Sequence, residues 1–574
     1  MRTLHQSSSA SPTPDPPQGK EGGREDQSLS PSFSPEGWAD PTWEGWTEWD
    51  WRALPSWVTD FRPHQLQAVE EVLDAYDRGA DVVFLDAPTG AGKTLIGEMV
   101  RRRLGGKALY VCHSLGLQDQ FEHDFPYAEV LKGRANYPTQ IAPFPEVTCA
   151  DCTLTTAPEA EDAWCAWCSE PAMCSYVEVR GKALEGALAV TNTAYLLAEA
   201  NNVGRLLKDR SLVIADEADT LEQILMGTAE FRIGPGVMRR AKVEMPKKGS
   251  HGTTIGKWMV DELRPGLKML YAKIGGSEDV EKIRERKKIA RLIGRVEEVA
   301  REIQGDGWVR DYDRTDSLIL KPVKVDTVGQ DWVWKHAERW LLMSATLVST
   351  DEMVESLGMA GMKVETVTVP MTFPVENRRI HAVPVATMTA KEKETAWPKM
   401  AEAVKGIQQL HPDEKILVHT VSYDLAKYLA REARAGGRQV YTYSSSQFRD
   451  HEVEAFKKET RPAIMFAPSL DRGFDFKGDE ARVVIVAKVP YLYLGDQQVS
   501  ARLRTRGGQH WYNVSTIRTL VQMTGRGVRS ADDHCVTYIL DGSFYKLYKD
   551  CKSMLPAWWR DALDTRTTRR DLGL

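Results

Sequence analysis

The chain has 574 residues, too many for one hydrophobic core, so we expect several domains of about 100–200 residues each. Hydrophobic residues make up 42% of the chain and charged residues 27%, as in ordinary globular proteins. No apolar run approaches the roughly 20 residues that span a bilayer, and residues 1–20 lack a signal-peptide core, so we expect a cytoplasmic protein. The net charge of –6 arises within residues 1–50, and the remaining chain carries 72 basic and 72 acidic side chains. A bound polyanion would therefore need local basic patches.

Residues 1–56 are predicted to form a disordered tail, because Ser, Pro, Gly and Asp dominate residues 1–36. Tryptophans then follow in close succession. They suit stacking on bases or docking of a partner, but we favour the interpretation that several pack the tail onto the first domain. They are Trp38, Trp43, Trp46, Trp49, Trp51 and Trp57.

A phosphate-binding loop is predicted between an apolar strand, Asp81–Asp86, and a helix that includes Leu95–Val100. Gly90 and Gly92 let backbone N–H groups wrap around phosphate oxygens at the helix N-terminus. The residues expected to bind ATP and Mg²⁺ are Thr89, Gly90, Ala91, Gly92, Lys93 and Thr94. Lys93 would reach the outer phosphates and the Thr94 hydroxyl would ligate Mg²⁺. Ala87 replaces the glycine of the strict pattern.

Gln65 begins an amphipathic helix upstream of this loop, after Phe61-Arg-Pro-His. Its amide carries a donor and an acceptor and suits the edge of an adenine ring. A polar helix start explains the same residue equally well.

A second half of the nucleotide site is predicted where the strand Ser211–Ala215 ends in Asp216-Glu217-Ala-Asp219. Asp216 can hold Mg²⁺ through water, and Glu217 can orient and deprotonate the attacking water. Together with Lys93 and Thr94, these acids indicate a site that hydrolyses nucleoside triphosphates.

Three later segments show which kind of ATPase this is. The strand from Trp340 ends in Ser344-Ala-Thr346, and another strand from Ala463 runs into a loop with Gly473 and Asp475. Gln522-Met-Thr-Gly-Arg526-Gly-Val-Arg529 places two arginines three apart, which predicts one helical face. Their planar guanidinium groups suit the charge on a transferring phosphoryl group.

In this order the motifs resemble those of the superfamily-two helicases, over roughly residues 57–545. The resemblance implies two RecA-like α/β domains with ATP between them. It makes Arg526 and Arg529 the arginine fingers and gives Ser344 and Thr346 a coupling role. It also assigns Gln65, Gly473, Asp475 and Gln522 to the ATP site.

A narrower resemblance is to the XPD/DinG-like iron–sulfur DNA helicases. It is carried by Leu131–Tyr137, Val190–Leu197 and Thr372–Arg378. Asp219 and Asp471 depart from that group, which usually has His and Glu at these places.

Five cysteines lie within 26 residues, which predicts a bound metal group. They are Cys149, Cys152, Cys165, Cys168 and Cys174. Two CxxC pairs suit tetrahedral Zn²⁺, although their twelve-residue gap is slightly short. The resemblance instead implies a [4Fe–4S] cluster on four of the five, and we favour the cluster with zinc as the alternative.

A helical insert is expected between the two halves of the first domain. Residues 239–301 carry 17 basic and nine acidic side chains, and an apolar stripe runs from Ile289 to Ile303. Such basic clusters suit phosphates along a single strand, whereas a solvated helix face is the ordinary explanation. The resemblance implies an arch that gates the strand.

The predicted organisation is a tail (1–56), a first RecA-like domain (57–372) and a second one (373–574). The first domain would contain a cysteine-rich insert (138–180) and a helical arch (225–330). Thr420, Ser422 and Ser469 follow strands of the second domain and suit backbone phosphates or, equally, the capping of helices. We expect an ATP-dependent helicase on single-stranded or forked DNA, moving five-prime to three-prime by resemblance. A DEAD-box-like RNA helicase and an ATP-dependent DNA clamp are the alternatives.

Overall fold

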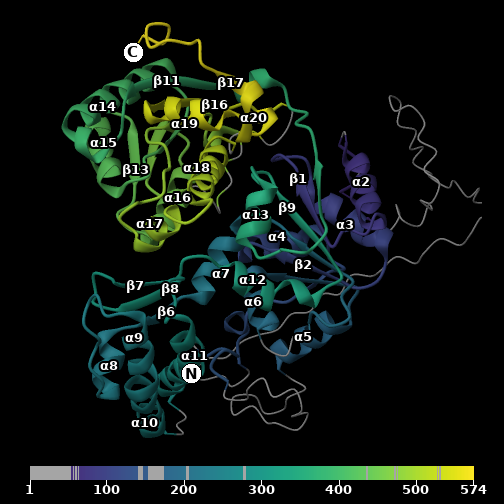
Figure 1. Cartoon of the computed structure of the whole chain (residues 1–574). Helices are drawn as coiled ribbons and strands as arrows, with labels where there is room; N and C mark the ends of the chain where they lie inside the picture. Colours follow the sequence, from purple (N-terminus) through teal and green to yellow (C-terminus); the bar gives the residue numbers. More distant parts are fainter. Residues whose placement is uncertain are drawn as a thin grey trace, which may run out of the picture. The chain divides into compact units, whose positions relative to one another are not determined.

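The computed structural model describes residues 54–573 except 56, 59–60, 63, 140–146, 153–173, 202–205, 276–278, 435–436, 471–473, 475, 477, 526–527 and 529–531. The chain divides into two units, residues 1–54 and 55–574, and the second contains the sheets and helices labelled in Figure 1. Within the described residues, no helix has the length and apolar character needed to cross a membrane. The tryptophans from Trp38 to Trp51 lie outside the described part of the chain.

The first sheet has seven parallel strands in the order β10-β1-β9-β5-β2-β4-β3. Its central strands are short apolar runs buried on both faces, which suits a parallel sheet covered by helices on each side. The strands are β1 (Val82–Asp86), β2 (Ala108–Cys112), β3 (Glu129–Val130), β4 (Leu188–Asn192), β5 (Leu212–Ala215), β9 (Arg339–Ser344) and β10 (Val364–Thr368).

Helices follow nearly every strand of this sheet, as in a chain of βαβ units. They are α2 (Gln65–Asp77), α3 (Lys93–Leu104), α4 (Leu115–Asp124), α5 (Ser175–Glu185), α6 (Thr193–Ala200), α7 (Leu221–Ala229), α12 (Asp326–Trp332) and α13 (Thr350–Ser356). Trp57 donates from Nε1 to the carbonyl of Asp124 at 2.7 Å and meets the Phe125 ring edge-on. This tryptophan therefore packs onto the first domain.

The second sheet also has seven parallel strands, in the order β13-β14-β12-β15-β16-β11-β17. Its strands are β11 (Ile380–Ala386), β12 (Ile416–His419), β13 (Gln439–Thr442), β14 (Ala463–Ala467), β15 (Val483–Val486), β16 (Val536–Asp541) and β17 (Leu563–Asp564). Its helices are α14 (Lys393–Leu410), α15 (Tyr423–Arg434), α16 (Ser446–Lys458), α17 (Gln497–Leu503), α18 (Gly508–Thr524), α19 (Ser543–Cys551) and α20 (Ala557–Ala562). The two parallel α/β sheets agree with the RecA-like folds predicted from the motifs.

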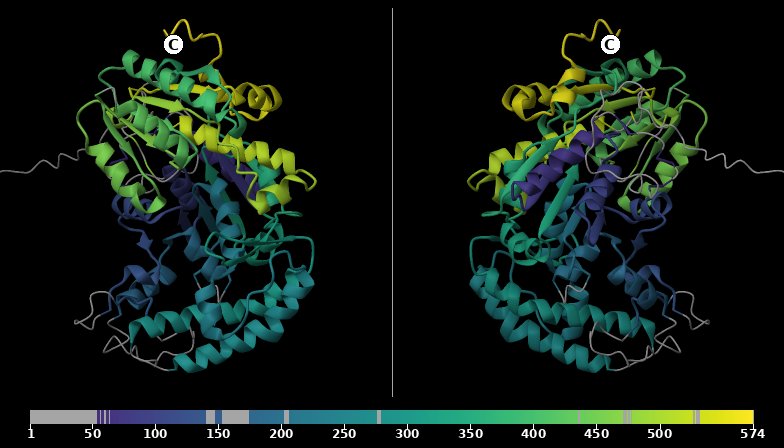
Figure 2. Two further views of the ribbon diagram at one scale, coloured as in Figure 1. Left: turned by 90° about the vertical axis from the view of Figure 1, so that its left-hand side faces the viewer. Right: turned by 90° about the vertical axis from the view of Figure 1, so that its right-hand side faces the viewer.

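A third, antiparallel sheet in the order β6-β8-β7 accompanies a group of helices between α7 and α12. The elements are β6 (Phe231–Ile233), α8 (Pro235–Ala241), α9 (Gly252–Trp258), a π-helical turn (Met259–Leu263), α10 (Arg264–Ile274), α11 (Val280–Glu302), β7 (Trp308–Tyr312) and β8 (Leu318–Pro322). Trp258, Leu267 and Ile289 belong to a separate hydrophobic core for this group. In Figure 2 its long helices, in teal, run alongside each other.

Helix α11 begins with acidic residues, Asp279 at its N-cap and Glu281 in its first turn. The Asp279 carboxylate accepts hydrogen bonds from the backbone N–H groups of Glu281 and Lys282, at 2.9 and 3.3 Å. An N-cap of this kind satisfies donors that have no partner within the helix. The N-cap of α11 is thus Asp279.

Candidate active site

The predicted phosphate loop lies at the carboxyl edge of the first sheet, between β1 and α3. Gly90 and Gly92 have φ values of +85° and +80°, in the left-handed region that favours glycine. A Cβ atom at Gly92 would lie 2.2 Å from Nε2 of Gln65. The loop therefore needs glycine there both for its backbone conformation and for the close approach of Gln65.

Gln65 is buried and braces this loop. Its Nε2 donates to the carbonyl of Ala91 at 2.9 Å, and its Oε1 accepts from the backbone N–H of Arg62 at 2.6 Å. Both ends of the amide therefore contact the backbone in this structure. The helix start and the nucleotide loop, 26 residues apart, are joined by this one side chain.

The acidic pair follows β5 at the same edge of the sheet. The Asp216 N–H donates to the carbonyl of Val111 at 3.0 Å, and the Glu217 N–H donates to Oδ1 of Asp216 at 2.9 Å. Burial raises the pKa of Asp216 from 3.8 to about 6, against the opposing effect of the Lys93 charge. Lys93 is thus close enough to Asp216 for the lysine of the loop and the acid of β5 to act on one ligand.

Asp219 connects the acidic segment to the hydroxyl pair at the end of β9. Its two carboxylate oxygens accept hydrogen bonds from Ser344 Oγ at 2.7 Å and Thr346 Oγ1 at 3.0 Å. All three side chains are buried. Asp219 is one of the two departures from the XPD/DinG-like pattern, and here it serves as a double acceptor for the predicted coupling residues.

Gln522, which lies on helix α18 of the second domain, also contacts these residues. Its Nε2 donates to Thr346 Oγ1 at 2.6 Å. We call the chain Asp219, Ser344, Thr346 and Gln522 the hydroxyl relay. It links the segment after β5, the end of β9 and the last turn of α18.

The predicted arginine fingers lie outside the described residues, as do Gly473 and Asp475. Helix α18 ends at Thr524 with Gly525 at its C-cap. The described part of α18 therefore stops short of both arginines, and their placement on one helical face stays a prediction. Thr89 of the phosphate loop and Gly525 line the same small cavity, so the residue just before Arg526 lies near the loop.

A buried group of charges was missed by sequence reasoning. We call Glu222, Glu352, Arg502 and Arg518 the interdomain cluster. The two glutamates lie in helices α7 and α13 of the first domain, and the two arginines lie in α17 and α18 of the second. Arg502 pairs with Glu222 and lies 3.6 Å from Glu352 Oε1, and Arg518 Nη2 lies 3.0 Å from Glu352 Oε2. Their side chains are between 3% and 15% exposed. An isolated charged residue in a sequence ordinarily indicates a position on the protein surface. No feature of the sequence therefore distinguishes these four residues as buried.

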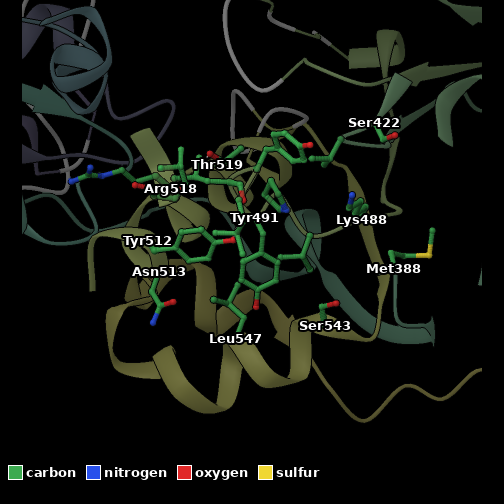
Figure 3. A pocket seen from close by; sticks show the side chains of 18 of the residues that line it. Met388, Ser422, Lys488, Tyr491, Tyr512, Asn513, Arg518, Thr519, Ser543 and Leu547 are labelled. Carbon is green, nitrogen blue, oxygen red and sulfur yellow. Dashed lines mark hydrogen bonds between the residues drawn. The ribbon is translucent and has the colours of Figure 1, made fainter. Parts of the chain in front are cut away.

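Three members of the interdomain cluster, Glu222, Arg502 and Arg518, line a cavity of about 1940 Å³. This exceeds the roughly 300–1,000 Å³ of small-molecule pockets, so the cavity suits a polymer. Figure 3 shows Tyr512 and Asn513 on one side of it and Ser422 and Lys488 on the other. The rings of Tyr491 and Tyr512 stack with centroids 5.9 Å apart. Two of the predicted phosphate-binding hydroxyls, Ser422 and Ser469, line the cavity, and Thr420 is not among the lining residues.

Three of the five predicted metal cysteines lie in the described part of the chain. Cys149, Cys152 and Cys174 are buried, and the sulfurs of Cys149 and Cys174 are 3.8 Å apart. Cys165 and Cys168 lie outside the described residues. Among the described residues no group of three or more His, Cys, Asp or Glu side chains is arranged to hold a metal.

Several arginines of the helical insert have partners within the protein. Arg284 forms two hydrogen bonds with Asp151, at 2.8 and 3.0 Å, and Arg240 pairs with Glu285. Arg295 donates to the carbonyls of residues 228–230. These arginines hold the insert together and attach it to the segment between Cys149 and Cys152, so a strand-guiding role rests on the other basic residues.

Two families match separate parts of the chain. One, described as "Helicase C-terminal domain", matches residues 406–562, and the other, "Type III restriction enzyme, res subunit", matches residues 59–218. The match to residues 406–562 covers most strands of the second sheet. The match to residues 59–218 contains the phosphate loop and the acidic pair.

Relatives of known name are distant in sequence. The "ATP-dependent DNA helicase YoaA" of Haemophilus influenzae is 22% identical over 84% of this chain and 91% of its own length. YoaA of Escherichia coli is 23% identical over 41% of this chain, and the match spans 38% of that protein. The "3'-5' exonuclease DinG" of Bacillus subtilis is 24% identical over 39% of this chain and 26% of its own length.

Among solved structures, an XPD helicase has a TM-score of 0.61 at 16% identity and is matched over 86% of this chain and 98% of its own. Xpd4 of S. tokodaii has a TM-score of 0.57 at 14% identity, over 88% of this chain and all of the other. These likenesses concern the fold.

The two parallel sheets, the phosphate loop, the acidic pair and the relay to α18 define an ATP-hydrolysing enzyme of the helicase class. The two family matches and the named relatives support a superfamily-two helicase similar to the XPD/DinG-like group.

Proposed function

We propose that this protein is an ATP-dependent DNA helicase that moves along single-stranded DNA and separates duplexes. The observation that supports this most strongly is the hydroxyl relay, which joins the acidic segment of one sheet to Gln522 of the other. Movement of one domain against the other would thereby act on the residues of hydrolysis. Its relatives named DNA helicases favour DNA over RNA.

In this proposal the chain's residues divide the work of hydrolysis. The loop from Thr89 to Thr94 holds the phosphates of ATP, with Lys93 on the outer ones. Mg²⁺, when bound, would neutralise charge between the phosphates, held by Thr94 and, through water, by Asp216. Glu217 orients the attacking water and takes its proton.

The remaining predicted roles belong to residues outside the described part of the chain. Arg526 and Arg529 would stabilise charge on the transferring phosphoryl group, and Gly473 and Asp475 would complete the ATP site. The position of Gly525 beside Thr89 supports this for Arg526. Five-prime to three-prime movement rests on family resemblance.

The large cavity would hold the single strand. Its hydroxyls suit phosphates, its tyrosines suit stacking on bases, and Lys488 adds positive charge. Tyr493, at 79% exposure, projects from the same lining and is available to a base.

Cysteine thiolates would hold a metal group in the insert. Cys149 and Cys174 would be two of its ligands, because both thiols are buried and adjacent. The thiol donor set fits a metal group, a [4Fe–4S] cluster as the resemblance implies or Zn²⁺ as the alternative.

The test of the proposed function is an ATPase and strand-displacement assay with the full chain. We expect single-stranded DNA to stimulate ATP hydrolysis, a forked duplex to be unwound, and Lys93→Ala to abolish turnover while DNA binding persists. Stimulation by RNA alone would favour the RNA helicase, and hydrolysis without strand release would favour the clamp. Retained turnover in Lys93→Ala would refute the assigned ATP site.

A further inference from the structure

Arg518 and Gln522 lie four residues apart on α18 and so share one face of that helix. Both contact the short segment that follows β9. Gln522 donates to Thr346, and Arg518 donates from Nε and Nη2 to the carbonyl of Leu347 at 3.2 and 3.1 Å. Two consecutive turns of one helix are thus fixed to two consecutive residues of the other domain.

Other side chains hold the Arg518 guanidinium in place. Its Nη2 pairs with Glu352 at the start of α13, and Glu352 also lies beside Arg502. Arg502 donates to Ser356 Oγ at 2.6 Å, and its guanidinium lies 4.2 Å from the ring centroid of Trp511. These partners determine where the Arg518 guanidinium lies, and that position sets where Leu347 lies.

The segment that Arg518 contacts leads directly to the residues of hydrolysis. Leu347 follows Thr346, Thr346 donates to Asp219, and Asp219 comes two residues after Glu217. A displacement of Leu347 would therefore alter the hydrogen bonds that position the acidic segment. The same arginine lines the large cavity, together with Arg502, Glu222 and Asp219.

We propose that Arg518 is a positioning residue that couples occupancy of the strand cavity to ATP hydrolysis. It does so by fixing the segment from Ser344 to Leu347 against α18. This inference rests on the proposed function and adds to it a residue outside the recognised motifs. Arg518 acts through the hydroxyl relay and contacts neither ATP nor water in the reaction.

Arginine is required here because of the shape of its donor group. The planar guanidinium reaches the carbonyl of Leu347 with two N–H groups while also pairing with Glu352. The lysine ammonium keeps the charge but is a compact point donor on a flexible stem, so it cannot reproduce that arrangement. Arg518→Lys therefore removes the geometry and retains the charge.

The experiment measures ATP turnover by Arg518→Lys in the full chain, with and without single-stranded oligothymidylate. The matched control is Arg210→Lys, because Arg210 is also buried but donates to backbone carbonyls within the first domain. We expect Arg518→Lys to lower the DNA-stimulated kcat by on the order of tenfold, at an unchanged KM for ATP. Arg210→Lys should keep the wild-type kcat and respond to DNA normally.

A second variant, Glu352→Gln, tests the same contact from the other partner and keeps the arginine. It should also lower the stimulated kcat, and combining it with Arg518→Lys should cost less than the two losses added, because the residues act together. Wild-type stimulation in Arg518→Lys, or additive losses in the double variant, would overturn the inference. An inactive wild-type protein would instead overturn the proposed function.

Discussion

The substitution Asp216→Asn is expected to stabilise the fold of the first domain while abolishing ATP hydrolysis. Burial raises the pKa of Asp216 from 3.8 to about 6 in the absence of nucleotide and Mg²⁺. Above pH 6 the carboxylate is charged in both the folded and the unfolded chain, and the folded chain bears the full cost of burying it. Below pH 3.8 both states are protonated and the cost disappears.

The size of the effect follows from this change in pKa. One pKa unit corresponds to 1.36 kcal/mol, so moving the pKa from 3.8 to about 6 costs about 3 kcal/mol at pH 7.5. Asparagine has the shape of the protonated acid and avoids this cost. For a domain of 150–250 residues, 1 kcal/mol shifts Tm by about 2–4 °C, so we expect a gain of roughly 6–12 °C.

Thermal unfolding in EDTA, at pH 7.5 and pH 5, measures the difference between Asp216→Asn and the wild type. At pH 5 the gain should shrink to about half, because the folded wild type is then largely protonated while the unfolded chain is not. The matched control is Asp219→Asn, which loses an acceptor for Ser344 or Thr346 and should lower Tm. A Tm for Asp216→Asn at or below that of the wild type at pH 7.5 would refute the reasoning.

Three further outcomes are expected. Mg²⁺-dependent binding of a fluorescent ATP analogue should weaken as the pH falls below about 6, where Asp216 loses its charge; affinity unchanged down to pH 5 would argue against Asp216 as an Mg²⁺ residue. Tyr493→Ala should weaken binding of single-stranded DNA by about 5- to 150-fold, the equivalent of one base stack, and much less for an abasic strand. Its control, Tyr545→Ala, alters an exposed tyrosine outside the cavity lining and should bind normally. Cys174→Ser should lower the metal content measured by elemental analysis, and a metal content equal to that of the wild type would exclude it as a ligand.

Local motifs were the predictable part of this site. The phosphate loop, the acidic pair after β5 and the hydroxyl pair after β9 each lie within a few residues of a strong apolar strand. The register of β1 with β9 places Asp86 opposite Ser344, so these segments meet at one edge of the sheet. The order of strands in a parallel sheet brings the motifs together, and the sequence pattern is sufficient to find them.

Contacts between distant residues were not predictable in the same way. Arg518 and Glu352 are 166 positions apart, and neither lies in a recognisable motif. In the helical insert the sequence shows an excess of basic residues, but Arg284 and Arg240 are paired with Asp151 and Glu285. The number of charged residues in a segment does not show which of them form ion pairs in the folded protein.

The burial of the interdomain cluster has a consequence for how salt affects this motor. Buried ion pairs are shielded from dissolved ions far better than exposed ones. Protein contacts with the phosphates of a strand, in contrast, weaken steeply as salt rises because bound counterions are released. Added salt should therefore release DNA while the contact between the two motor domains persists. Ionic strength can therefore be used to separate DNA binding from the contact between the two domains.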